Sequence, residues 1–218
     1  MDATLRDGMR AALPLLLPTL LIGVSFGVAA RSLGWGVAEP IVMSIVVFSG
    51  SAQFASTGVL AAGGGLGAAI GAATLANLRF LPLGLLTAPA TRGNAVQRAF
   101  EGQLTVDASV ILATDEHGNV SRGLFIGATI AQAACWIGGT ALGAAVDLGS
   151  DGSEIGIDVI FPAFFLYLLF AEAHGGAHPY RVAAGGALIA FVLIPLTPAG
   201  IPVVAATLAA VLGMGRRR

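Results

Sequence analysis

Runs of apolar residues, each close to twenty residues long, recur from one end of this chain to the other. A bilayer core about 30 Å thick needs about 20 helical residues to cross it. Of the 218 residues, 56% are hydrophobic and only 11% are charged, against about 25% charged residues in an ordinary soluble domain. Because this is too little charge to coat a soluble globule, the sequence predicts an all-α polytopic transmembrane bundle.

We expect about seven apolar segments in a single transmembrane domain that covers residues 1–218. Their approximate bounds are 11–30, 41–62, 66–88, 123–146, 157–173, 182–197 and 199–214. The last three are short and contain or adjoin prolines, which is typical of discontinuous helices in transporters. Short helices in a thinned bilayer are the alternative.

The polar stretch 91–122 is expected to be a cytoplasmic amphipathic loop. Its apolar spacing predicts one helix over about 94–113, lying at the interface or entering the bundle, and then a turn at "DEHGN". The positive-inside rule places this loop, the 174–181 loop and the C-terminus in the cytoplasm through Arg92, Arg98, Arg122, Arg181 and "RRR" at 216–218. The 147–158 loop has four carboxylates and no cation, which fits the outside.

The N-terminus conflicts with this assignment. Arg6 and Arg10 also favour the cytoplasm. Three single crossings before the 91–122 loop would instead put residue 1 outside. Two alternatives remain: the N-terminus breaks the rule, or one early segment, with 41–62 the obvious candidate, is re-entrant.

Several function classes lack support in the sequence. The net charge of -1 suggests no nucleic-acid partner. The pair His174 and His178 has no nearby ligand cluster, so neither a metal nor another cofactor is expected. The glycines at 63–65 lack the lysine of a phosphate loop. With no catalytic constellation in the apolar segments, we do not expect an enzyme.

The stretch "FSGSAQFAST" places polar residues inside an apolar segment, where they are costly and usually functional. A glycine between two serines can break a helix, and a broken helix offers one end to a carboxylate and the other to an ammonium. The candidate substrate-binding residues here are Ser49, Gly50, Ser51, Gln53 and Phe54. The alternative is that the hydroxyls bond back to the preceding turn and the glycine aids packing.

A second cluster, "ANLRFLP", contains Asn77 and Arg79 well inside the third segment. An intramembrane arginine is expected either to extend to the cytoplasmic interface or to clamp a carboxylate. Its candidate partners are Asp107 and Glu172.

A third cluster, "AQAACWIGGTALG", places Gln132 and Trp136 on one helix face, which Thr140 continues. Trp136 lies near the middle of its segment, away from the usual interfacial belt. It is expected either to wall a binding pocket or simply to pack. Gly139 and Gly143, like Gly67 and Gly71, have the spacing of close helix packing.

Taken together, these stretches resemble the AzlC family, the large subunits of two-component branched-chain amino acid permeases. The resemblance rests on "FSGSAQFA", on "NLR" about twenty residues later, and on the run of Gln132, Trp136, Gly139, Thr140 and Gly143. It covers nearly the whole chain from about residue 15. It implies export of branched-chain amino acids such as valine and a small, separately encoded AzlD-like membrane partner.

We therefore expect a gradient-driven secondary transporter subunit in a bacterial cytoplasmic membrane. The broken segment would hold the carboxylate and amine, and Phe48, Phe54 and Phe164 would surround the side chain. Asp107 and Glu172 are the candidate titrating groups for coupling. The alternative is a non-transporting membrane scaffold whose Gly/Ala faces bind the small partner.

Overall fold

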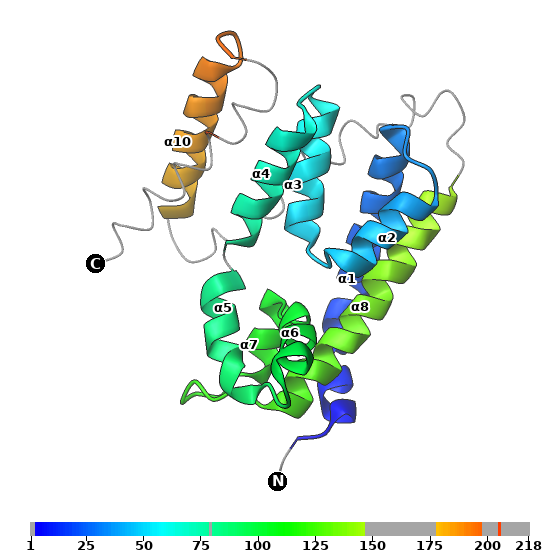
Figure 1. Ribbon diagram of the computed structural model, residues 1–218, viewed down its shortest axis with the longest axis vertical. Helices are drawn as coiled ribbons and strands as arrows, with labels where there is room; N and C mark the ends of the chain where they lie inside the picture. The colour runs from blue at the N-terminus through cyan, green and yellow to red at the C-terminus, as the bar shows by residue number, and fades with distance from the viewer. Residues whose placement is uncertain (1–2, 79, 147–177, 198–204, 206–218) are drawn as a thin grey trace. The chain divides into compact units, whose positions relative to one another are not determined.

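The computed structural model describes residues 3–78, 80–146, 178–197 and 205 (Figure 1). Within them the regular structure is helical apart from one β-bridge, which confirms the all-α class. The chain forms two compact units, each described here by itself. The first holds Met1–Arg31, Trp35–Gly50 and Asn77–Asp147, and the second holds Ser32–Gly34, Ser51–Ala76 and Leu148–Arg218.

Five of the seven predicted apolar segments fall on described helices, and 157–173 and 199–214 lie outside the described residues except for residue 205. Among the described residues, α1 (Leu5–Ser32) and α8 (Arg122–Ala145) are each long and apolar enough to cross a membrane. A third crossing is reached if α4 (Leu66–Asn77) and α5 (Phe80–Thr87) form one bent span. Seven crossings remain a prediction.

In the first unit, α1 and α8 pack closely through glycines. A Cβ added to Gly8 would lie 2.8 Å from the Gly123 carbonyl oxygen, and one added to Gly23 would lie 2.7 Å from the Trp136 carbonyl oxygen. Only glycine permits this backbone approach. The contacts advance along both helices together, so α1 and α8 run in the same direction (Figure 1).

The predicted packing role of Gly139 and Gly143 is confirmed, since a Cβ on either residue would overlap the backbone of α1. The same prediction fails for Gly67 and Gly71 in the described part of the chain, where an added Cβ meets no heavy atom within 4 Å.

The helix α2 (Ala38–Val46) lies against the second half of α8 and runs in the opposite direction, because Ser44 meets Thr140 while Gly50 meets Trp136. The helix α5 continues toward the other end of α8, where Leu83 packs on a core of Val110, Ala113, Phe125 and Ile126. Together, α2 and α5 therefore cover α8 from its C-terminal half to its N-terminal end.

This arrangement bears on the N-terminus. Parallel α1 and α8 place residues 3–8 at the same end of the pair as the 91–121 loop. After α1, the chain returns once along α8, through α2 and then α5, and so reaches the 91–121 loop at the end from which α1 began. The geometry thus favours the re-entrant alternative, in which the arginines of the N-terminus and of the loop share one side of the membrane.

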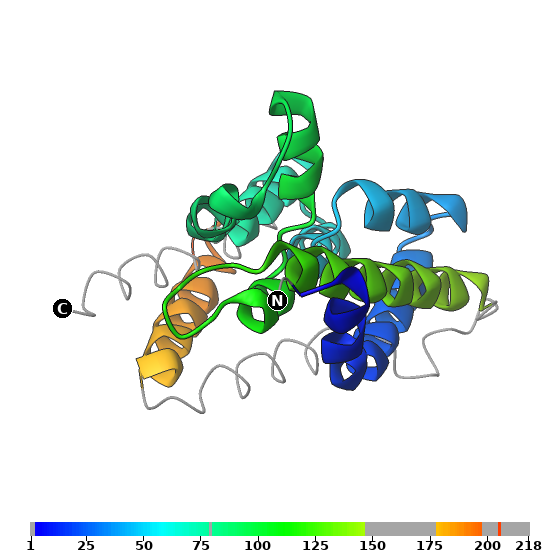
Figure 2. The same cartoon turned by 90° about the horizontal axis from the view of Figure 1, so that it is seen from below.

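The loop contains two helices where one was expected. The prediction of one continuous helix over 94–113 is wrong. Residues 104–106 separate two helices, α6 (Ala95–Gln103) and α7 (Asp107–Ala113). Asn94 and Gln97 form a capping box that starts α6. The expected turn is confirmed, since a β-bridge pairs Thr114 with Val120 around it. The view from below shows α6 and α7 near the start of α8 (Figure 2).

In the second unit, α3 (Gly50–Ala61) and α4 pack through a small core of Val59, Ala69 and Ala72. Beyond the end of α3 at Ala61, Gly63 has φ +77°, and the Gly63 and Gly64 amides donate to the Leu60 and Val59 carbonyls. This is a Schellman cap, so the glycine run at 63–65 is a helix stop. The helix α10 (His178–Leu193) lies on the sixth predicted segment.

Candidate functional site

The apolar segment 41–62 is broken, as predicted, but the break lies at 47–49, between α2 and α3. Gly50, Ser51 and Gln53 were expected in the break and instead form the first turn of α3. The turning residue is Phe48, with φ 38°, the left-handed region that costs a non-glycine residue about 1–2 kcal/mol. An outlier of this kind is commonest at functional sites.

At the break, the chain passes from the end of one helix, α2, to the start of another, α3. The carbonyls that end α2 carry partial negative charge, and the amides that begin α3 carry partial positive charge. Such a pair of ends can attract the ammonium and the carboxylate of an amino acid.

Ser49 links this break to a second one. Its hydroxyl, in a residue only 4% exposed, donates a 2.6 Å hydrogen bond to Asn77 Oδ1. Asn77 is the last residue of α4, and α5 begins at Phe80. Two predicted site residues 28 positions apart therefore meet where both segments are interrupted.

Trp136 lies beside the same break. A Cβ added to Gly50 would lie 2.7 Å from Trp136 Cη2, so the indole ring rests on the glycine backbone. Phe26 of α1 stacks on this ring, with centroids 6.4 Å apart and planes 20° from parallel. The ring therefore contacts both Gly50 and Phe26. The first unit thus joins Gly50 to Trp136 as well as Ser49 to Asn77.

Polar pairs continue along α8 on both sides of Trp136. The Ser44 and Thr140 hydroxyls, both fully buried, share a 2.9 Å hydrogen bond. Gln132 Nε2 donates 2.8 Å to Ser109 Oγ on α7. Gln132 is thus held by the loop helix rather than by the break. Ser44 and Ser109 are absent from the predicted site, although a serine in the apolar run "MSIVV" was a usable signal.

Gln103, the last residue of α6, was also missed. Its Nε2 donates to the Val46 carbonyl oxygen at 2.8 Å and lies 3.4 Å from that of Val47. A glutamine in a polar loop gave no sign that it reaches the end of α2.

Within α3, Gln53 and Phe54 are fully buried. The Ser56 and Thr57 hydroxyls donate to the Gln53 carbonyl oxygen at 2.9 and 2.8 Å. The packing alternative weighed for this stretch is therefore correct for Ser56 and Thr57, but not for Ser49, whose bond is long-range.

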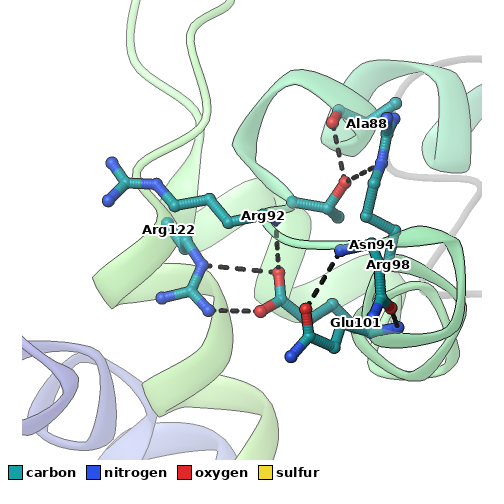
Figure 3. Close-up of polar contacts among 8 residues, drawn as sticks. Ala88, Arg92, Asn94, Arg98, Glu101 and Arg122 are labelled. Atoms are coloured by element: carbon teal, nitrogen blue, oxygen red, sulfur yellow. Dashed lines mark hydrogen bonds and ion pairs between the residues drawn. The ribbon is translucent and has the colours of Figure 1, made fainter.

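The loop is anchored to α8 through Glu101 (Figure 3). Its carboxylate pairs with the Arg122 guanidinium and accepts from the Arg92 amide at 3.1 Å. The hydrogen bond from Arg122, reinforced by that amide and by the charges of Arg92 and Arg122, lowers the pKa of Glu101 below its ordinary value. Arg122 is thus a structural anchor as well as an orientation signal.

The remaining predicted residues are less fully placed. Arg79, Phe164 and Glu172 lie outside the described residues, so the proposed pairing of Arg79 stays a prediction. Asp107 begins α7, two residues before Ser109. No group of three or more metal-ligating side chains occurs among the described residues.

Comparison with known proteins identifies relatives along the chain. The chain is 29% identical to an "Uncharacterized membrane protein" of Archaeoglobus fulgidus, covering 98% of this chain and 95% of the relative. It is 25% identical to "Inner membrane protein YgaZ" of Escherichia coli, covering 78% and 74%. It is 23% identical to "Branched-chain amino acid transport protein AzlC" of Bacillus subtilis, covering 78% and 68%.

No solved structure matches this chain. The family model described as "AzlC protein" matches residues 14–147, which contain both breaks, Trp136 and the anchored loop. The chain therefore belongs to the AzlC family.

Proposed function

We propose that this chain is the transporting subunit of a permease that exports branched-chain amino acids such as valine. The name of the Bacillus subtilis relative supports the substrate class. The observation that carries the proposal is the hydrogen bond between Ser49 and Asn77, because it joins two places where apolar segments are interrupted and helix ends leave backbone groups unpaired within the helix.

In this proposal, the first turn of α3, with Gly50, Ser51 and the neighbouring Ser49, receives the substrate carboxylate. The carbonyls that end α2 receive the ammonium. Phe48 and Phe54 contact the branched side chain. A charged side chain would have no partner among such groups, which disfavours charged amino acids.

Other residues support this site. Asn77 positions Ser49 through its hydrogen bond. Trp136 walls the break beside Gly50, and Gln53 and Gln132 supply buried amides on α3 and α8. Arg79 is proposed as a carboxylate clamp.

Transport is proposed to be secondary and driven by a gradient, with a small AzlD-like subunit as partner. Asp107 and Glu172 are the proposed proton-carrying groups. Asp107 lies two residues from Ser109, which binds Gln132, so a charge change there is close to the buried polar face of α8.

The non-transporting scaffold is less well supported. It requires Gly/Ala faces that are free for a partner subunit. The face of Gly139 and Gly143 is covered by the backbone of α1 within the same unit, whereas an added Cβ at Gly67 or Gly71 meets no described heavy atom within 4 Å. The buried hydrogen bond between Ser49 and Asn77, where both segments are interrupted, is what favours the transporter.

The test is flux of labelled valine in proteoliposomes that contain this chain and its AzlD-like subunit. We expect saturable valine flux that an imposed proton or substrate gradient accelerates. Absence of valine flux under every imposed gradient would contradict the proposal.

A further inference from the structure

The end of α2 borders the break, and a side chain already binds its carbonyls. An α-helix leaves its last four carbonyls without intrahelical partners. At α2, the Met43 carbonyl accepts from the Val47 amide at 2.8 Å, and the next carbonyls toward the break include those of Val46 and Val47. Gln103 Nε2 donates to Val46 at 2.8 Å.

We propose that the Gln103 carboxamide occupies the ammonium subsite of the substrate and must leave it when an amino acid binds. This rests on the proposed function. The carboxamide NH₂ resembles an ammonium in offering N–H donors at hydrogen-bond distance, but it is neutral. Gln103 thus competes with the substrate and sets the affinity for the amine.

The chemistry favours displacement by an ammonium. A helix C-terminus attracts cations, and hydrogen bonds from a charged donor are roughly twice as strong as neutral ones. The same two carbonyls therefore bind a substrate ammonium more tightly than the Gln103 amide.

The surroundings of Gln103 allow its side chain to leave while the helix stays. Glu101 pairs with Arg122, and the Leu104 carbonyl oxygen accepts from Thr129 Oγ1 at 2.9 Å. The backbone on both sides of Gln103 is therefore tied to α8. Gln103 itself is exposed, so its amide can exchange the carbonyls for solvent by rotation about its own bonds.

The experiment compares Gln103→Leu and Gln103→Glu with the wild-type chain, each reconstituted with its AzlD-like subunit. Neither variant can donate to the Val46 carbonyl. If the hydrogen bond from Gln103 to the Val46 carbonyl contributes the usual ~1 kcal/mol, its removal lowers the half-saturating valine concentration about fivefold. Inhibition of valine flux by 3-methylbutanoate, which has the valine skeleton without the amine, should be unchanged.

Gln97→Leu is the matched control, because Gln97 lies on the same exposed helix and, among the described residues, its side chain accepts from the Asn94 amide of the capping box and not from α2. We expect wild-type valine affinity for it. If Gln103 were merely structural, both Gln103 variants would bind valine equally well or less well than the wild type, and that result would overturn the proposal. A wild-type protein that transports no valine contradicts the proposed function itself, and with it the proposed competition between Gln103 and the substrate.

Discussion

The Ser49 hydroxyl donates a 2.6 Å hydrogen bond to Asn77 Oδ1, and this bond joins the two places where helices of the membrane segments are interrupted. Both residues belong to the same compact unit. Because Ser49 is 4% exposed, the bond is shielded from bulk water. The break at 47–49 is therefore stabilised by a buried hydrogen bond.

Ser49→Ala and Asn77→Ala should each raise the half-saturating valine concentration about tenfold, because each leaves a polar group at the break without its partner. The double variant should be no worse than the more severe single variant, since both remove one interaction. Thr74→Ala is the control: the Thr74 hydroxyl is exposed and bonds back to Ile70 on α4. Fully additive losses would show that the two residues act separately.

Gly50→Ala should reduce valine flux strongly, since the new methyl group would lie 2.7 Å from Trp136 Cη2 and force the ring to move. Gly58→Ala lies on the same helix and meets no described heavy atom within 4 Å, so it should retain flux. The smaller ring of Trp136→Phe should partly restore Gly50→Ala. Equal flux in both glycine variants would argue against a role for this contact.

The parallel course of α1 and α8 predicts that residues 4 and 120 face the same side of the membrane. Thr4→Cys and Val120→Cys can be labelled separately with an impermeant thiol reagent, after Cys135→Ser removes the single native cysteine. Both positions should react from the cytoplasmic side. Labelling from opposite sides would restore the alternative of three single crossings.

Acid should weaken the anchor of the loop. The folded protein lowers the pKa of Glu101, chiefly through Arg122, so the carboxylate stabilises the fold at pH values above its unfolded pKa of about 4.3. This stabilisation is lost as pH falls through the lower, folded pKa. The effect should be at most about 1 kcal/mol because the Arg122 side chain is 38% exposed.

Thermal unfolding in detergent at pH 7 and at pH 3 measures this effect, with Glu101→Gln as the variant that cannot titrate. The wild type should lose more stability than Glu101→Gln on acidification. An equal loss in the two proteins would show that the ion pair contributes nothing.

The sequence was most informative where polar residues interrupt apolar runs. The pattern around Ser49 predicts a break, and Gln132 with Trp136 predicts a buried face of α8; both features are present. The predicted position of the break was wrong by a few residues, because the chain turns at Phe48 in the left-handed region and Gly50, expected in the break, already begins α3.

Other features depend on contacts between distant residues and could not be read locally. The 94–113 stretch has no helix breaker at 104–106, yet the Leu104 carbonyl oxygen binds Thr129 of α8, and the helix is divided there. Gln103 likewise looked like an ordinary loop residue. Its partner, Val46, lies 57 positions away.

The most direct test of the central claim is binding of valine beside Trp136. The chain has two tryptophans, so Trp35→Phe leaves Trp136 as the single indole reporter at the break. Titration with valine should change its emission saturably, and Asn77→Ala should shift the midpoint to about tenfold higher valine concentration. Valine flux without any change in Trp136 emission would contradict a binding site at this break.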